Sequence, residues 1–592
     1  MGSAVSSNRR MFQRLSPLFP YLRRYWRSYV WGGLSLLLYN ACKSVIALVI
    51  GRSIDDMRLG LNVAKVEHYA FLLLGIAGVS AVFLYLMRQI LIGASREIEF
   101  DIRNDLFQRL EAQQPSFFQR HRTGDIMARS TNDLNAVRQL LGPAIMYSAN
   151  TVVFIAFALP FMIRISPRLT LLAFLPMPFI SVLIQYFGAR IHTRFERIQA
   201  MFSDISAMAE ENFSGARLIR AFAQEEAQIA AFEEANQEYI RRSLLLARLM
   251  AMLWPTLELM LGVSLMITLL VGGRETAQHQ ISVGQFTSYF VYMVQLTWPM
   301  IAIGWVTNLV QRGAASVVRI HDLMTEKPTI DDAAALPELV SAPIAGSVEF
   351  RNLSFTYATG PEVLHDLSLE IPAGSSLAIT GPTGSGKSSL VSLIPRLQDA
   401  EPGMVLIDGR PIREYPLETL RRAIGFVPQE TFLFSETIRE NVAFGVDQAS
   451  DEQILDAATT AHIGTEILEF PKGFQTIVGE RGMTLSGGQK QRTAIARALL
   501  RDPRILILDD ALASVDTQTE DRILTGLREA MQGRTTILIA HRVSTARNAD
   551  RIAVIIDGRI AELGTHDELL ERGGYYAELA EKQSLEEEIV NA

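Results

Sequence analysis

Residues 381–389 read GPTGSGKSS, and this stretch decides the fold of the C-terminal half of the chain. The strand-like SSLAIT precedes it and the helix-like LVSLIPRL follows it. Glycines at this spacing let backbone N–H groups turn inward, and the helix N-terminus adds partial positive charge, so this pattern is typical of a phosphate-binding loop. The lysine reaches the β- and γ-phosphates, and the serine after it suits Mg²⁺. The expected nucleotide-binding residues are Gly381, Pro382, Thr383, Gly384, Ser385, Gly386, Lys387, Ser388 and Ser389.

A second element of the same chemistry is RILILDD, residues 504–510. Its continuous apolar run predicts a strand of a parallel sheet buried on both faces, with Asp509 and Asp510 at its exposed end. Asp509 is expected to hold Mg²⁺ together with Ser388. From residue 347 onward, β-rich runs alternate with helical ones, which predicts an α/β domain over 347–592.

The first 320 residues have the composition of a membrane domain. The chain of 592 residues is 49% hydrophobic, with a mean hydropathy of +0.17, and its formal charge of −7 excludes a globally basic nucleic-acid-binding protein. The single cysteine, Cys42, lies in an apolar run and is expected to be a small buried hydrophobe. Domain 1–320 is predicted to contain six helices of about 20 apolar residues, enough to cross a bilayer. Their expected bounds are 29–51, 68–93, 142–164, 168–189, 249–272 and 284–309.

The placement of arginine indicates how this domain is oriented. Segment 94–141 carries seven arginines and segment 190–248 carries eight, and the residues before the first span are basic. By the positive-inside rule, both termini and the α/β domain lie in the cytoplasm. Each inner segment contains a break with a glycine, at 116–129 and at 213–228, which favours a short docking element over a solvated loop. Residues 321–346, rich in Ala and Pro, are the expected linker.

The sequence LSGGQKQR (485–492) lies between the two phosphate-binding elements, and VPQ, VGERG, AHR and FTY accompany it in a set order. With these motifs the chain resembles the ATP-binding cassette (ABC) transporters over essentially its whole length. Six spans followed by one cassette are similar to an exporter-type half-transporter. The resemblance implies a multi-domain fold, with an all-α six-helix transmembrane domain and an α/β P-loop nucleotide-binding domain. It also implies that the breaks at 116–129 and 213–228 are coupling helices, and that ATP and Mg²⁺ are the cofactors.

The resemblance implies further residues of the nucleotide site. Tyr357, in FTY, would stack on adenine. Gln429, in VPQ, would join Ser388 and Asp509 around Mg²⁺. The catalytic residues would be Asp510, His541 and Gln429.

The resemblance also implies residues that act toward a second ABC half-transporter. The signature residues would grip the ATP bound to the phosphate loop of that partner; they are Ser486, Gly487, Gly488 and Gln489. Residues that would couple the two subunits are Asp516, Glu480 and Arg481. The other implied partners are the lipid bilayer and an amphipathic cargo, and nucleic acid is not among them.

Asp510 departs from the family pattern, which has Glu at this position to polarise the attacking water. The aspartate side chain is shorter by one methylene, about 1.5 Å. A displacement of about 1 Å at a reacting group costs on the order of 10²-fold in rate, so we expect this site to bind ATP well and to turn it over slowly. The stretch LDDALASVD resembles one subunit of bacterial heterodimeric multidrug exporters, whose partner keeps Glu. A homodimer that tolerates Asp, a homodimeric lipid flippase and a mainly regulatory ATP clamp remain as alternatives.

The sequence does not name the cargo. The resemblance implies an amphipathic drug or lipid that leaves the cytoplasm or the inner leaflet of a bacterial inner membrane. Lys43 and Glu258 are ionisable and lie well inside predicted spans, whereas Arg88 lies nearer an inner end. Lys43 and Glu258 either serve a function in the bundle interior or sit near an interface. Residues that either line a hydrophobic cavity or face lipid and neighbouring helices are Met146, Phe161, Met252, Trp254, Tyr289, Tyr292, Met293 and Trp298.

Overall fold

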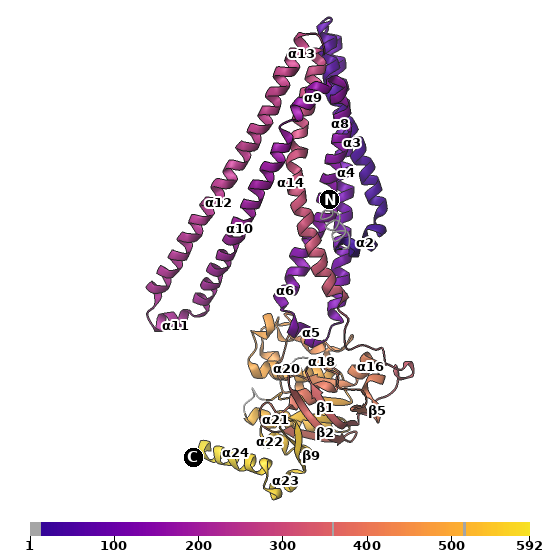
Figure 1. Ribbon diagram of the computed structural model, residues 1–592. Helices are drawn as coiled ribbons and strands as arrows, with labels where there is room; N and C mark the ends of the chain where they lie inside the picture. The colour runs from indigo at the N-terminus through magenta and orange to yellow at the C-terminus, as the bar shows by residue number, and fades with distance from the viewer. Residues whose placement is uncertain (1–13, 358–359, 513–516, 592) are drawn as a thin grey trace. The chain divides into compact units, whose positions relative to one another are not determined.

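The computed structural model describes residues 14–357, 360–512 and 517–591, which form two compact units (Figure 1). The helical unit runs from the first described residues to Glu111 and from Thr123 to Glu326. The α/β unit contains residues 112–122 and the chain from Lys327 onward. The predicted fold, a helical membrane domain with a separate α/β nucleotide-binding domain, is confirmed.

The helical unit consists mainly of long helices, several of which extend well beyond an apolar stretch. Its α-helices are α2 (Phe19–Arg24), α3 (Trp26–Arg58), α4 (Val63–Glu111), α6 (Thr123–Ala128), α7 (Leu134–Gln139), α8 (Ile145–Ile165), α9 (Pro167–Phe174), α10 (Met177–Ser214), α11 (Ala216–Ala221), α12 (Glu225–Ile267), α13 (Gly273–Ala277) and α14 (Val283–Thr325). Short π-helical segments at Arg129–Asp133, Leu140–Ala144 and Thr268–Gly272 continue neighbouring α-helices without a break.

Five helical stretches of the described chain are long and apolar enough to cross a membrane. They are Trp26–Arg58, Val63–Glu111, Thr123–Ile165, Glu225–Ala277 and Val283–Thr325. These stretches contain five of the six predicted spans. The remaining prediction, 168–189, differs from the structure because α9 ends at Phe174 and α10 begins at Met177. Pro176, between them, has no backbone N–H and interrupts the hydrogen-bond ladder, so no single helix covers that range.

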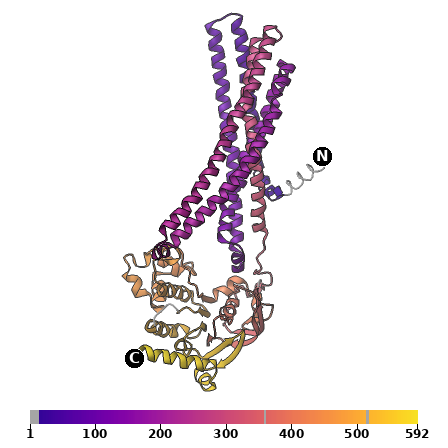
Figure 2. The same ribbon diagram turned by 60° about the vertical axis from the view of Figure 1, so that its left-hand side comes forward.

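Helices α10 and α12 form a long hairpin closed by α11, and the two run side by side in both views (Figures 1 and 2). The closing helix α11 lies within the predicted break at 213–228. The break at 116–129 contains α5 (Pro115–Arg120) and α6, separated at His121. Helix α5 belongs to the α/β unit, where Phe117 is fully buried and the Gln114 side chain accepts a hydrogen bond from the Thr329 N–H at 3.2 Å.

The α/β unit alternates strands and helices as its sequence predicts. Its strands are β1 (Val348–Thr356), β2 (Glu362–Ile371), β3 (Ser376–Thr380), β4 (Val405–Ile407), β5 (Arg410–Pro411), β6 (Ile424–Val427), β7 (Ile505–Asp509), β8 (Thr535–Ile539), β9 (Arg551–Ile556) and β10 (Arg559–Gly564). Its other helices are α15 (Lys387–Leu393), α16 (Leu417–Arg422), α17 (Ile438–Ala443), α18 (Asp451–Thr460), α19 (Gly464–Glu469), α20 (Gly487–Leu500), α21 (Thr517–Met531), α22 (Val543–Ala546), α23 (His566–Arg572) and α24 (Tyr575–Asn591).

The strands form a six-stranded sheet in the order β10-β9-β3-β8-β7-β6 and a four-stranded antiparallel sheet in the order β2-β1-β4-β5. In the larger sheet β9, β3, β8, β7 and β6 are parallel. Strand β7 has Leu506 and Leu508 in one hydrophobic core and Ile505 and Ile507 in the other. Because successive side chains of a strand point to opposite faces, an uninterrupted apolar run is what a doubly covered strand requires.

The chain between the two units begins later than expected and packs on the smaller sheet. Helix α14 continues to Thr325, past the predicted domain boundary at 320. Within the expected linker 321–346, Leu339 and Ile344 are buried in the core that includes β1 and β2. The apolar positions of this Ala- and Pro-rich segment therefore serve as anchors on the α/β unit.

Candidate nucleotide site

The candidate site lies at the carboxyl ends of four neighbouring parallel strands. Strand β3 leads into the phosphate loop, β7 ends at Asp509, β8 leads to His541, and β6 leads to Gln429. Because the carboxyl ends of adjacent parallel strands share one edge of the sheet, residues far apart in the sequence meet there. The structure thus brings together the residues predicted from the GPTGSGKSS, RILILDD, VPQ and AHR stretches.

The phosphate loop passes so close to other backbone that two of its glycines have no room for a side chain. A Cβ on Gly381 would lie 2.1 Å from the Ile555 carbonyl oxygen, and one on Gly386 would lie 2.7 Å from Leu364. Both glycines have positive φ values, +140° and +96°, which L-residues rarely adopt. The Ser385 hydroxyl is buried and has no hydrogen-bond partner among the described residues. This unpaired hydroxyl and the crowded glycines fit a loop that holds a bound phosphate.

Lys387 is the cation of this loop. It is only 6% exposed, and its Nζ donates to the carbonyl oxygens of Gly381 and Pro382 at 2.9 and 2.8 Å. Burial lowers the pKa of the Lys387 ammonium, and the nearby carboxylates of Asp510 and Asp509 act in the opposite direction. A phosphate would therefore meet an ammonium group that is already held in the loop and poorly solvated.

Ser388 and Asp509 form the pair expected to hold Mg²⁺. The Ser388 hydroxyl donates to Asp509 Oδ1 at 3.0 Å, and Asp509 is 5% exposed. Burial is the main cause that raises the pKa of Asp509, and a cation beside it would favour the ionised form. Within the part of the chain that the structure describes, no group of three or more His, Cys, Asp or Glu side chains is arranged for a metal ion. That fits Mg²⁺, which is usually bound by one or two protein oxygens together with substrate phosphates.

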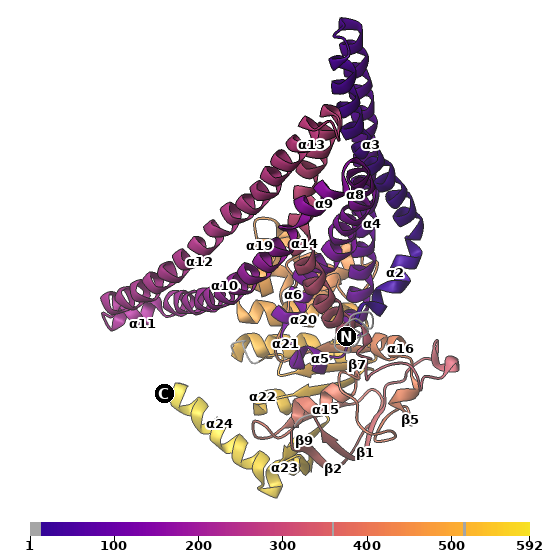
Figure 3. The same ribbon diagram turned by 45° about the horizontal axis from the view of Figure 1, so that its top comes forward.

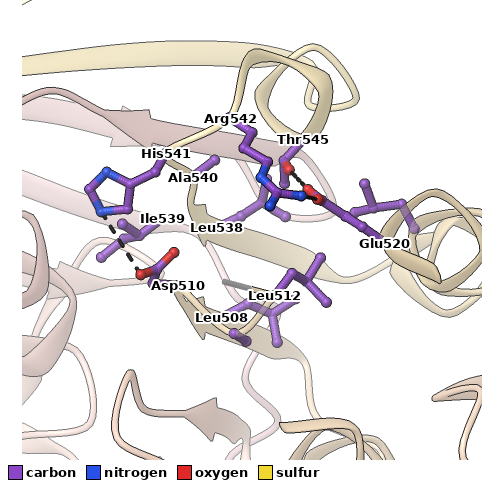
Figure 4. Close-up of a pocket in the computed structure, with 12 residues that line it drawn as sticks. Leu508, Asp510, Leu512, Glu520, Leu538, Ile539, Ala540, His541, Arg542 and Thr545 are labelled. Carbon is purple, nitrogen blue, oxygen red and sulfur yellow. Dashed lines mark hydrogen bonds and ion pairs between the residues drawn. The ribbon is translucent and has the colours of Figure 1, made fainter. Parts of the chain in front are cut away.

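Asp510 directly follows β7 and faces both other predicted catalytic residues. Its Oδ2 lies 4.0 Å from His541 Nε2 (Figure 4). The same oxygen accepts a hydrogen bond from Gln429 Nε2 at 3.4 Å. Asp510 has φ +50°, a left-handed conformation in which Asp is more common than most residues. The three side chains proposed for catalysis therefore meet around one carboxylate.

A cavity of about 250 Å³ extends from Asp510 and His541 between α21 and the end of β8. On its far side the carboxylate of Glu520, 3% exposed, accepts hydrogen bonds from Arg542 and Thr545 (Figure 4). Our reading of the sequence missed Glu520. The available signal is an acid on the apolar face of α21, one turn before the buried Ile523 and Leu524.

The C-terminal helix α24, yellow in Figure 3, supplies a residue that holds the backbone around His541. The Gln583 side chain donates to the His541 carbonyl at 2.9 Å and accepts from the Val543 N–H at 2.8 Å. One carboxamide thus joins the backbone on both sides of Arg542. No sequence motif points to Gln583, because its partners are backbone groups about forty residues away.

Tyr357 lies beside the phosphate-loop helix, where the resemblance expects an adenine-stacking residue. Its hydroxyl and that of Ser389 are 2.8 Å apart, and its ring makes an edge contact with Phe355 at 5.0 Å between centroids. The ring is half-buried, so part of its surface remains available.

The signature residues lie at the start of α20. Ser486 caps this helix: its hydroxyl accepts from the Gln489 N–H at 3.2 Å, and the Gln489 side chain accepts from the Ser486 N–H at 2.9 Å. Gln489 also donates to Glu466, which forms an ion pair with Arg492 at 2.6 Å. Ser486 and Gly487 are exposed, and among the described residues no hydrogen bond or ion pair joins the signature to the phosphate loop.

The residues predicted to couple subunits are only partly described. Glu480 is exposed in a short 3-10 helix, Glu480–Gly482, which also contains Arg481, of which the backbone alone is described. Asp516 lies outside the described residues.

The span residues predicted as cavity or packing positions fall into two groups. Tyr289, Tyr292, Met293 and Met146 are buried in the helical unit, and Phe161 stacks on Tyr292 with 6.3 Å between ring centroids. Those that are exposed are Met252, Trp254 and Trp298. The buried group therefore packs against neighbouring helices, as the second reading of these residues expected.

Residues 30–300 match the ABC transporter transmembrane region and residues 364–513 match the ABC transporter domain. A probable multidrug resistance ABC transporter ATP-binding/permease protein of Bacillus subtilis is 35% identical over 578 residues, 97% of this chain and 98% of that protein. The chain belongs to the ABC transporter family.

Other proteins similar to this ABC transporter include a lipid flippase and an exporter of known structure. An ATP-dependent lipid A-core flippase of Syntrophus aciditrophicus is 34% identical, covering 94% of this chain and 92% of that protein. The solved structure of a bacterial Atm1-family ABC exporter with ATP bound has a TM-score of 0.77 and 29% identity, over 95% of this chain and 99% of that one. The chain is thus a multi-pass membrane protein of exporter type that binds ATP and couples its hydrolysis to transport.

Proposed function

We propose that this chain is one subunit of a heterodimeric exporter that moves amphipathic compounds, drugs or lipids, out of the cytoplasm or the inner leaflet. The observation that carries the proposal is Asp510, which stands between Gln429 and His541 where the family has Glu. The shorter carboxylate is set back from an attacking water, so the site on this chain's phosphate loop turns over slowly. The partner supplies Glu in the other site.

The site residues take the following roles in this proposal. The phosphate loop, 381–389, and Lys387 bind the triphosphate, while Tyr357 stacks on adenine. Ser388, Asp509 and Gln429 hold Mg²⁺, whose charge offsets the negative charge of the phosphates. His541 orients the γ-phosphate and the water beside Asp510. Glu520 and Gln583 position the segment that carries His541 and are not themselves catalytic.

The signature completes the second site. Ser486, Gly487 and Gly488 present the N-terminus of α20, where N–H groups and the helix dipole favour an anion. In the closed pair they grip the γ-phosphate on the partner's loop, and Glu480, Arg481 and Asp516 connect the two cassettes. Helix α11, with the segment around α5, transmits closure to the spans, because ATP stabilises the closed state more than the open one.

In this proposal the chain also has a defined orientation in the membrane. The arginine-rich segments put both termini and the α/β domain in the cytoplasm, and the membrane is the inner membrane of a bacterium. A homodimeric lipid flippase is the second candidate, and its support is the 34% identity with the lipid A-core flippase of Syntrophus aciditrophicus.

The steady-state ATPase of the purified chain in lipid, alone and co-expressed with its genomic neighbour, separates these candidates. The heterodimer predicts slow turnover alone and at least about 10-fold faster turnover for the pair. Equal turnover by the chain alone, with stimulation by lipid only, would establish the homodimeric flippase. A pair that stays slow and moves no amphiphile would instead support the regulatory ATP clamp.

A further inference from the structure

Lys43 places a cation near the middle of the apolar part of the helical unit. It lies on α3, and its Nζ is 4.7 Å from the ring centroid of Phe154, which stands near the middle of the 21-residue helix α8. Phe154 is fully buried. Helices α3 and α8 pack together (Figure 1), so the ammonium sits on the seam between two membrane-spanning stretches.

The direction of the side chain argues against a position at the interface. Nine residues separate Lys43 from the exposed Arg52, about 14 Å along a helix at 1.5 Å per residue. That distance exceeds the length of a lysine side chain. The ammonium also lies 5.9 Å from the ring of Tyr39, which precedes Lys43 by one turn, so the side chain points away from Arg52 and back along the helix. A snorkelling lysine would point the other way.

Lys43 has no counter-ion in this chain's described part. Among the described residues no hydrogen bond or ion pair involves its ammonium group, which lies against the rings of Tyr39 and Phe154. Glu258, the other ionisable residue that lies well inside a predicted span, is exposed on α12 and forms no ion pair with Lys43. A cation within a membrane span is unfavourable unless it is paired, which makes an unpaired one a candidate binding group.

A second polar group lies one turn away on the same seam. Asn40, fully buried, donates from Nδ2 to Asn150 Oδ1 at 3.0 Å and to the Leu36 carbonyl at 2.9 Å. Asn150 accepts this bond through its oxygen, and among the described residues no hydrogen bond uses the two N–H donors of that half-buried amide. The Asn40 Oδ1 is a buried acceptor that likewise has no partner among the described residues. Asn150 and Phe154 are four residues apart on α8, and Asn40 and Lys43 are three residues apart on α3, so each pair lies on one face of its helix. Ammonium and amide donors thus occupy one seam.

We propose that Lys43 and Asn150 bind the anionic oxygen group, a carboxylate, sulfonate or phosphate, of an amphipathic cargo. The proposal rests on the exporter function proposed above and specifies its substrate class as anionic amphiphiles. A resident lipid does not supply this anion, because its headgroup lies at the bilayer surface, about 15 Å from the middle of a hydrocarbon core of about 30 Å. A cargo drawn into the bundle brings its anion to this depth, while its apolar tail contacts aromatic and aliphatic side chains.

The test uses three probes that share a pyrenebutyl tail: pyrenebutyrate, pyrenebutanol and pyrenebutyl-trimethylammonium. Binding is measured by fluorescence titration of the full transporter in nanodiscs, with empty nanodiscs subtracted, and stimulation of ATPase is measured in parallel. Lys43→Gln is expected to weaken binding of the anionic probe at least about 10-fold and to change the other two less than about 2-fold. Lys43→Arg keeps the charge and is expected to remain within about 3-fold.

Two further variants keep the result interpretable if Lys43→Gln assembles poorly. Asn150→Leu is expected to weaken the anionic probe alone, by about 3-fold. Lys65→Gln removes a lysine from outside the predicted span 68–93, where Lys65 pairs with Asp56 at 3.9 Å, and is the matched control with no expected effect. Equal losses for all three probes, or no loss at all, would overturn the proposal. If no probe stimulates ATPase, the exporter function for these compounds fails, whereas the binding titration still decides the role of Lys43.

Discussion

The phosphate loop lies at one edge of the sheet, and the signature lies at the start of α20. These two regions differ in whether their functional groups contact one another within this chain. At the phosphate loop, Lys387 donates to its own loop, Ser388 bonds Asp509, and Asp510 faces His541. At the signature, Ser486 caps its own helix and is exposed. One region converges on a common point inside the chain, whereas the other presents a helix N-terminus to the surface.

The two regions also differ in which reactive groups they contain. The phosphate-loop edge gathers a cation, a pair expected to hold Mg²⁺ and a carboxylate from the ends of β3 and β7, but its carboxylate is the shorter Asp510. The signature contains no acid or base of its own, and its residues keep the family pattern. In the proposed heterodimer the signature serves the faster site, so substitutions at the signature should reduce transport more than substitutions at Asp510.

The largest expected effect is that of Ser486→Arg in the co-expressed pair. A bulky cation blocks the N–H groups that grip the partner's γ-phosphate, so ATPase and dye efflux should fall by about 10²-fold or more. Asp510→Asn in the same pair should change turnover by less than about 2-fold. Thr565→Arg controls for loss of a helix cap, since Thr565 forms the same kind of capping box at α23. If Asp510→Asn proves as damaging as Ser486→Arg, Asp510 is a working catalytic base and the comparison fails.

Asp510→Glu should remove the difference between the two regions. The added methylene returns the carboxylate toward the water, so the ATPase of the purified chain without a partner should rise by on the order of 10²-fold. Asp557→Glu is the matched control, because Asp557 also has a left-handed backbone with φ +48°. Unchanged turnover in Asp510→Glu would show that another feature, such as the placement of His541, keeps this site slow.

Lys387→Ala tests whether the phosphate loop binds ATP, because the variant is assayed for ATP binding and not for turnover. Loss of a buried ammonium that contacts the phosphates should weaken ATP binding at this chain's own loop by roughly 10- to 100-fold, the value of one charge-assisted hydrogen bond. Photo-crosslinking with azido-ATP and peptide mapping near Tyr357 measures it. Lys472→Ala removes an exposed lysine of the same domain and should leave labelling unchanged. Undiminished labelling in Lys387→Ala would refute the assignment of the loop.

Gln583→Met is expected to have the smallest effect, since it alters only the support of His541. The variant keeps the volume of the side chain and removes both hydrogen bonds to the backbone, each worth about 1 kcal/mol. In an Asp510→Glu background kcat should fall about 3-fold with KM nearly unchanged, and the Val543 amide should exchange faster. Lys582→Met, at the exposed neighbouring position, is the control. Unchanged exchange at Val543 would mean that Gln583 does not hold this segment in solution.

The sequence predicted the elements whose pattern is local. A glycine-rich loop between a strand and a helix, and an apolar run ending in Asp509, can be recognised in a few residues because their backbone requirements are local. Membrane-spanning stretches can also be recognised from the sequence, because a helix that crosses a bilayer needs about 20 consecutive, mostly apolar residues. The predicted fourth span, 168–189, is not one continuous helix in the structure because Pro176 divides it, and hydropathy does not register a missing N–H.

Only the tertiary structure decided which side chains support the site and which stand alone. The bonds of Gln583 to the backbone around His541, and of Glu520 to Arg542 and Thr545, join α24 and α21 to the end of β8. Backbone groups accept any suitable partner, so such pairings leave no pattern in the residues between them. Lys43 was visible in the sequence as a charge in a span, but the sequence did not determine its surroundings. The Lys43 ammonium group lies against the rings of Tyr39 and Phe154, and no carboxylate among the described residues pairs with it. Both features depend on how α3 packs against α8, because burial and pairing require neighbours that only the folded chain supplies.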